Sequence, residues 1–273
     1  AFGLGFLTGP ALGGITSDVS LLDWHPGLAA WGIHPFSVPA LIAFGLCLVN
    51  LVWVATRFRE TLPPGQRGTG VTLRERNPIH ALFTLKDATV RRTNVVGFLI
   101  VFFFCFFETT ISFFTADELG YDPHQLTWVF VYLGTVSIVT QGFLVRRAVV
   151  VLGEKTMALL GVSLLAVGLV SLGQSVGVAH SPPLMYLTLT LCALGTSFAN
   201  VGFSALISLY ASSAEQGKVM GIYRSLGFLA RAASPALAGF LYFRLHGAWT
   251  FGIAGTALVV PLALGLSLPK PVK

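Results

Sequence analysis

Residues 5–14 read GFLTGPALGG, and a partial copy, SPALAG, returns at residues 234–239. The glycines recur every four residues along the decamer, so they share one face of a helix that another backbone can approach closely. Pro10 removes one backbone hydrogen bond, which neighbouring groups must replace inside a membrane. The decamer therefore predicts a membrane helix that packs closely and bends.

The two copies lie in the first and the seventh of the apolar runs, so corresponding positions of the repeat are six runs apart. A parallel repeat of two six-helix halves is one of the architectures of secondary transporters. We expect both copies to act as packing and hinge elements. This set consists of Gly5, Gly9, Pro10, Gly13, Gly14, Pro235 and Gly239.

Composition places the chain in the membrane. Charged residues make up 10% of the sequence and hydrophobic residues 54%, whereas soluble domains carry about 25% charge. The three cysteines lie singly in apolar runs, so we expect buried thiols, no metal and no cofactor. Eight runs are predicted as helices. They cover about residues 1–15, 38–56, 94–115, 125–145, 155–174, 183–210, 218–243 and 248–268.

The loop charges predict the topology. Lys and Arg gather in the second, fourth and sixth loops and in the C-terminal tail, whereas the first, third and fifth loops contain neither. Arg244 departs from this alternation. The positive-inside rule then places the basic loops and the C-terminus in the cytoplasm, in a multi-pass protein of the cell (inner) membrane. The net charge of +6 thus reflects topology and contact with the lipid bilayer, and we expect no nucleic-acid partner.

One long connection divides the chain. In residues 57–92, two prolines and three glycines lie between residues 63 and 70, and an amphipathic stretch follows at residues 77–86. We interpret this segment as a cytoplasmic linker with a short interfacial helix. The predicted units are residues 1–56, with two helices, the linker 57–92, and a six-helix bundle at residues 93–273.

These features resemble the major facilitator superfamily, and in particular its drug:proton antiporters related to tetracycline efflux proteins. The decamer is similar to the signature of their fifth helix, FRETLPP at residues 58–64 to the end of the sixth, and residues 215–239 to the eleventh. The resemblance implies an all-α polytopic major facilitator fold. The chain would then hold the last two helices of the N-terminal bundle and the complete C-terminal bundle, starting after four helices of a longer, monomeric protein.

A cytoplasmic gating loop is also implied by resemblance. GFLVRRAVVVLGEK at residues 142–155 is similar to a degenerate copy of the family's Gly-x-x-x-Asp-Arg-x-Gly-Arg loop, without the acidic residue. The positions that carry the likeness are Gly142, Arg146, Arg147, Gly153 and Lys155.

Three charges lie well inside predicted membrane helices, away from their ends, where burying a charge costs free energy. They are Glu108, Arg224 and Arg231. Glu108 and Arg231 have matching depths, about 20 Å from the cytoplasmic ends of their helices. We expect Glu108 either to carry a proton during transport, coupled to Arg231 or to a cationic substrate, or to form a permanent structural ion pair. Arg224 is close enough to the surface to extend into the cytoplasm.

Polar side chains in membrane helices usually face the interior of the bundle. On this ground Ser112, Asn200 and Tyr132 are further candidates for substrate contact. The same argument applies to Asn50, Thr115, Gln141, Ser197 and Ser204.

The favoured function is secondary active transport of a small molecule by alternating access, coupled to protons and directed outward. The chain has no GxxxxGK[ST] motif for ATP binding. An intramembrane enzyme is disfavoured, because the predicted helices contain one carboxylate and no histidine to build a catalytic site. An open alternative is a non-transporting or incomplete major facilitator relative that acts as a membrane scaffold or partner.

Overall fold

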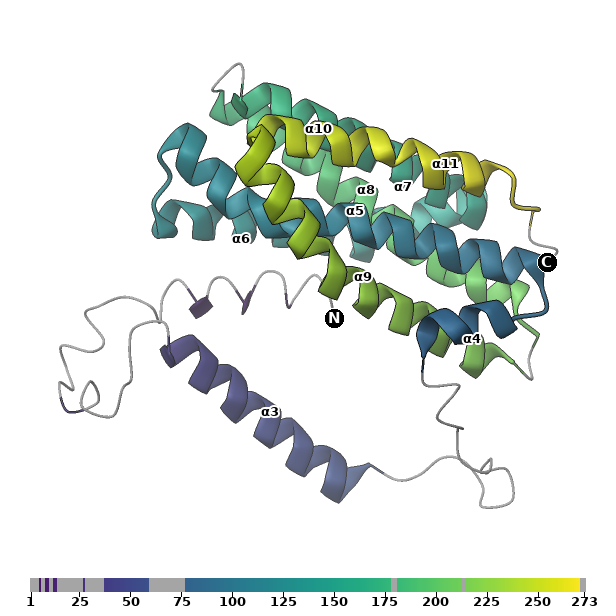
Figure 1. Ribbon diagram of the computed structural model, residues 1–273. Helices are drawn as coiled ribbons and strands as arrows, with labels where there is room; N and C mark the ends of the chain where they lie inside the picture. The colour runs from purple at the N-terminus through teal and green to yellow at the C-terminus, as the bar shows by residue number, and fades with distance from the viewer. Residues whose placement is uncertain are drawn as a thin grey trace.

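The computed structural model describes residues 37–58, 77–177, 181–212 and 215–270, together with six single residues between Gly5 and Gly27. Every regular element within the four described ranges is a helix (Figure 1). The separate helices are α3 (Ser37–Arg57), α4 (Pro78–Thr84), α5 (Ala88–Leu119), α8 (Pro182–Tyr210) and α9 (Gln216–Leu245). Two composite segments complete the fold. They are α6 (Pro123–Val139) with η4 (Thr140–Leu144) and α7 (Val145–Gly177), and α10 (Gly247–Ala257) with α11 (Val259–Leu266).

The predicted spans from residue 38 onward all correspond to helices, which confirms the all-α membrane fold. The first predicted span, at residues 1–15, lies outside the described ranges apart from single residues. Helix α5 begins at Ala88, before the predicted residue 94, because Asp87 caps it by accepting hydrogen bonds from the amides of Thr89 and Val90. The predicted interfacial helix in residues 77–86 is α4.

The chain turns at Gly153 between two spans. The apolar segment His124–Ser175 has 52 residues, which at ~1.5 Å per residue exceeds twice the ~30 Å thickness of the hydrocarbon core. Gly153 interrupts it with a φ of 75° and a ψ of 163°. Glycine tolerates this positive φ because it has no Cβ. The predicted spans 125–145 and 155–174 are therefore two helices that meet at one glycine.

Two pairs of helices, α7 with α8 and α5 with α9, make large contacts in the bundle. Helices α7 and α8 make the most extensive contact, and α5 packs along α9. At the first contact, a Cβ added to Gly161 would lie 2.4 Å from the amide nitrogen of Ala199, and one added to Gly195 would lie 2.4 Å from that of Leu165. Their backbones thus touch directly, which is the packing that small residues allow in membranes.

Helix α3 lies apart from this bundle in Figure 1 and has no buried residue. Cys47 is consequently exposed, and the prediction that all three cysteines are buried was wrong for this one, although Cys105 and Cys192 are buried. A helix of mean hydropathy 2.3 with an apolar surface all round is suited to lipid or to other apolar helices.

Polar contacts mark the two ends of the described bundle. Lys155, just after the Gly153 turn, donates hydrogen bonds to the carbonyls of Leu266 (2.9 Å) and Leu268 beyond the end of α11. Tyr210, at the end of α8, donates to the carbonyl of Pro269. At the other end, Tyr242 donates to Asp117 between α9 and α5. Within the described residues, the basic turn at Lys155 and the acidic segment at Asp117 therefore lie at opposite ends of the bundle (Figure 1).

Candidate transport cavity

A cavity of about 920 Å³ lies between α5, η4, α8 and α9. Its wall is mostly apolar, with polar groups contributed mainly by α8 and α9. A volume in this range is typical of sites for small organic molecules. The lining residues are Gly97, Val101, Gln141, Asn200, Val201, Ser204, Ala205, Ser208, Met220, Tyr223, Arg224, Gly227, Phe228 and Arg231.

Helix α9 brings two arginines to this wall. Arg224, Phe228 and Arg231 all line the cavity, as their spacing of four and seven residues on one helical face predicts. Pro235 continues the spacing but is not among the lining residues. Arg231 lies fifteen residues from the start of α9 and fourteen from its end, or ~22 Å from each. That position is at the centre of a membrane span.

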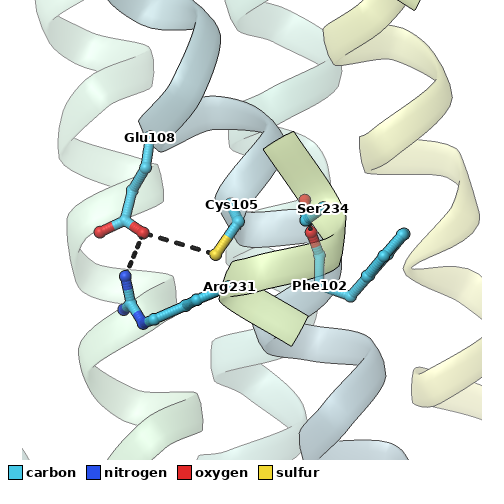
Figure 2. A network of polar contacts seen from close by, with 5 residues as sticks. All are labelled: Phe102, Cys105, Glu108, Arg231 and Ser234. Atoms are coloured by element: carbon cyan, nitrogen blue, oxygen red, sulfur yellow. Dashed lines mark hydrogen bonds and ion pairs between the residues drawn. The ribbon is translucent and has the colours of Figure 1, made fainter. Parts of the chain in front are cut away.

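Figure 2 shows the ion pair that joins α5 to α9 at this depth. Nη1 of Arg231 donates to Oε2 of Glu108. The side chain of Glu108 is 18% exposed and that of Arg231 is 37% exposed. Arg231 thus reaches the cavity wall, whereas Glu108 lies behind it and is largely buried. The expected pairing of Glu108 with Arg231 is present.

Two further contacts hold the pair in place (Figure 2). Sγ of Cys105, one turn before Glu108, lies 3.5 Å from the carboxylate oxygen that Arg231 contacts. The hydroxyl of Ser234 donates to the carbonyl of Phe102 on α5, at 2.6 Å.

Pro235 has no N–H to donate to the carbonyl of Arg231, four residues earlier. The helical ladder is therefore interrupted next to the charge, where α9 can bend.

Arg224 gives the described wall a net positive charge. It is exposed on the cavity, and no ion pair joins it to any residue in the described ranges. Arg224 and Arg231 are the two charged residues that line the described wall, and Glu108, which pairs with Arg231, lies behind it. In a site with low-dielectric surroundings this balance attracts anionic groups.

The polar candidates on α8 and η4 also reach the cavity. Asn200, Ser204 and Gln141 line it, whereas Ser197 accepts a hydrogen bond from Gln141 at 3.5 Å. Sequence reasoning missed Ser208, Met220 and Tyr223. Ser208 could have been found, since it extends the four-residue spacing of Asn200 and Ser204.

Other candidates lie elsewhere. The hydroxyl of Tyr132 lies 2.6 Å from that of Thr190, away from the residues that line the cavity. Ser112 is half-buried on α5, and Thr115 donates to the carbonyl of Ile111 in its own helix. Asn50 is exposed on α3.

The proposed gating segment forms the end of one span and the start of the next. Gly142 belongs to the π-helix η4, and Arg146 and Arg147 are exposed at the start of α7. Gly153 makes the turn, and Lys155 holds the C-terminal end of α11. Gating by these residues stays a prediction.

The hinge motif is only partly described. Pro10 and Gly14 lie outside the described residues, and no described atom comes within 4 Å of a Cβ added at Gly5, Gly9, Gly13 or Gly239. The packing role of both copies therefore stays a prediction. Among the described residues, no group of three or more His, Cys, Asp or Glu side chains is arranged to hold a metal ion.

Comparisons with known proteins agree with this architecture. The family model of the Major Facilitator Superfamily matches residues 96–273, which contain the cavity and both members of the ion pair. The chain belongs to the Major Facilitator Superfamily. This is a family of transporters and not of enzymes, and the match covers the whole of the predicted C-terminal bundle apart from its first residues.

The similarity to individual members of the superfamily covers nearly the whole chain. Major facilitator superfamily domain-containing protein 10 of Mus musculus is 27% identical over 99% of this chain and 58% of its own length. A class D tetracycline resistance protein of Salmonella ordonez is 25% identical over all of the chain and 64% of its own length. The crystal structure of the human organic anion transporter MFSD10 (TETRAN) superposes with a TM-score of 0.73 at 25% identity, covering 94% of this chain and 63% of that one. The chain thus spans less than two thirds of these relatives.

Proposed function

We propose that the protein is a secondary active transporter of a small organic molecule, coupled to protons at Glu108 and working by alternating access. The observation that carries the proposal is the Glu108–Arg231 ion pair at mid-membrane depth, whose arginine lines a 920 Å³ cavity. A carboxylate in such a place needs a reason, because burying charge in a membrane costs free energy. Binding and release of a proton during the transport cycle would explain why the carboxylate is there.

Protonation of Glu108 would change two things at once. It would remove the negative charge that pairs with Arg231, and it would loosen the link between α5 and α9 that this pair provides. The interrupted ladder at Pro235 lies one turn beyond Arg231, so α9 can respond to the loss by bending. A local charge change would in this way alter the packing of two helices, as switches of this kind require.

The finer form of the proposal is efflux by antiport, across a cell (inner) membrane with the basic end of the bundle in the cytoplasm. It rests on the positive-inside rule and on likeness to a tetracycline resistance protein. In this form a proton entering from outside and a substrate leaving from inside occupy the site in alternate states. A cationic group would compete directly with the proton for Glu108.

A second candidate is favoured by the positive wall. Arg224 and Arg231 suit an organic anion, which is also the substrate class of the human MFSD10 transporter. An anion would bind Arg231 when protonation has neutralised Glu108, so the proton and the anion would move in the same direction. The charge of the substrate therefore decides between exchange and co-transport.

One experiment tests both forms. The full-length protein in liposomes is assayed with a panel of labelled organic anions and cations under pH gradients of each sign. Antiport predicts that substrate moves against the direction of the proton gradient, and co-transport predicts movement along it. Glu108→Gln should abolish the response to the gradient in either case, whereas Glu118→Gln, at the end of the same helix, should keep it. A gradient response that survives Glu108→Gln would overturn the proposal.

A further inference from the structure

A second, much smaller pocket adjoins the cavity at α8. It has a volume of about 20 Å³ and lies between α5, α6, η4 and α8. Gln141 and Asn200 line both spaces, so they stand at the boundary between them. The remaining wall of this side pocket consists of Phe104, Phe107, Leu133, Ser137, Cys192, Ala193, Thr196 and Ser197.

The polar side of this pocket has more hydrogen-bonding capacity than the protein itself uses. Thr196 is 6% exposed, and its Oγ1 is buried without a hydrogen-bond partner among the described residues. A buried hydroxyl in this state costs free energy unless a partner is supplied. Ser137 and Asn200, also on the wall, make no side-chain hydrogen bond with a described residue.

The volume of the side pocket limits the size of the group that can bind in it. A cavity of ~10–15 Å³ or more holds one water molecule if it offers two to four polar groups. The side pocket is of this size, and it offers the side chains of Ser137, Gln141, Thr196, Ser197 and Asn200. The same wall contains no charged side chain, so it suits a neutral group and not an ion.

We infer that the side pocket is a binding site for a single O–H group, supplied by a water molecule or by a hydroxyl of the substrate. The group donates to or accepts from Thr196 Oγ1, with Ser137 and Asn200 as further partners. A substrate held in the main cavity would reach it past Gln141, which the π-helix η4 carries at this boundary. The substrate source rests on the proposed transport function, whereas the water source does not.

Hydroxyl-radical footprinting with X-rays tests the water source on the full-length protein without added substrate. Bound water is expected to cause oxidation of Cys192 and Phe107, although each is only 1% exposed. Met185 and Phe114, which are equally buried and outside the pocket, are the controls within the same molecule.

Two variants alter the pocket in different ways. Thr196→Val replaces the unpartnered hydroxyl by a methyl group, and Ala193→Val fills the space without removing a polar group. Both should lower oxidation at Cys192 towards the level of Met185. Thr188→Val is the matched control, because Thr188 is a buried threonine on the same helix outside the pocket. It should leave oxidation at Cys192 unchanged.

The substrate source is tested with benzoate and its three monohydroxy forms as probes, by competition and by thermal stabilisation. A hydroxyl that enters the pocket should improve the affinity of one form by about threefold to tenfold over benzoate, and Thr196→Val should remove that advantage. Oxidation without any such preference assigns the O–H group to water alone. A pocket that is no more oxidised than the controls and shows no hydroxyl preference would overturn the inference, whatever the transport assays show.

Discussion

The α7–α8 and α5–α9 pairs show two ways of joining helices in the same bundle. Helices α7 and α8 meet through glycines whose backbones touch, with no room for even one added methyl group at Gly161 or Gly195. Helices α5 and α9 meet through polar groups: the Glu108–Arg231 pair, Ser234 with a backbone carbonyl, and Tyr242 with Asp117. The first contact has one arrangement, whereas the second depends on groups that can change charge.

This difference suggests that one contact is rigid and the other can change during function. A contact of fitted surfaces is stable but cannot be switched by a ligand. A contact made of an ion pair and hydrogen bonds can be loosened by a proton or by a competing charge, and the main cavity opens beside it. We expect α7 and α8 to be the fixed scaffold and α5 and α9 to be the part that responds.

The largest effect is expected from Gly195→Val at the fixed contact. Its Cβ alone would come within 2.4 Å of the amide nitrogen of Leu165 and 2.7 Å of the carbonyl oxygen of Gly161. Overpacking against backbone should cost about 3 kcal/mol or more of stability. Size-exclusion analysis after heating of the full-length protein should show a large loss of folded material.

Gly221→Val, on α9, is the control for this change. No described atom lies within 4 Å of a Cβ at Gly221, so this variant should remain folded. An equal loss of folded material in both variants would show that the backbone contact between α7 and α8 does not contribute more to stability than an exposed position.

A smaller effect is expected from Arg231→Met at the responsive contact. Removing one member leaves Glu108 charged without its partner, but the pair is partly exposed, so we expect a cost of about 1–3 kcal/mol. Adding Glu108→Gln should restore most of that stability, because no unpaired charge remains. Thermal unfolding of the two single variants and the double variant forms a cycle that measures the coupling.

This cycle separates a structural role of the pair from a role in transport. If the pair is only structural, the stable double variant should transport as the wild type does. A role in coupling predicts instead a folded protein that no longer responds to a pH gradient.

The smallest effect is expected from Ser234→Ala. It removes the hydrogen bond to the carbonyl of Phe102 beside the ion pair. Hydrogen bonds between membrane helices contribute on average ~0.6 kcal/mol, so the loss should be close to that. Ser225→Ala, on an exposed part of α9, should shift the unfolding temperature less. A larger shift for Ser225 would contradict the contact assigned to Ser234.

The sequence predicted the helices and the ion pair because both depend on simple regularities. Apolar runs of membrane length and the alternation of loop charge need no knowledge of packing. Glu108 and Arg231 were paired from their matching depths, which follow from the rise per residue, and the resemblance to the superfamily further implies that their two helices are neighbours.

The sequence reasoning put the close packing at the decamer and at SPALAG, whereas the described close packing is at Gly161 and Gly195. Each of these glycines is followed by another seven residues later, Gly168 and Gly202, so a seven-residue glycine spacing was available as a signal. Which surfaces face each other depends on helix rotation within the bundle, and spacing along one helix does not specify it. The side pocket was missed for the same reason, since its wall comes from four elements.

The central claim is that Glu108 carries the coupled proton, and substrate counterflow tests it most directly. Liposomes containing the full-length Glu108→Gln variant are compared with wild type for two activities: accumulation driven by a pH gradient, and exchange of labelled for unlabelled substrate without a gradient. We expect accumulation to be lost while exchange continues, because the cavity and the moving helices remain. Accumulation at the wild-type level in this variant would contradict the claim.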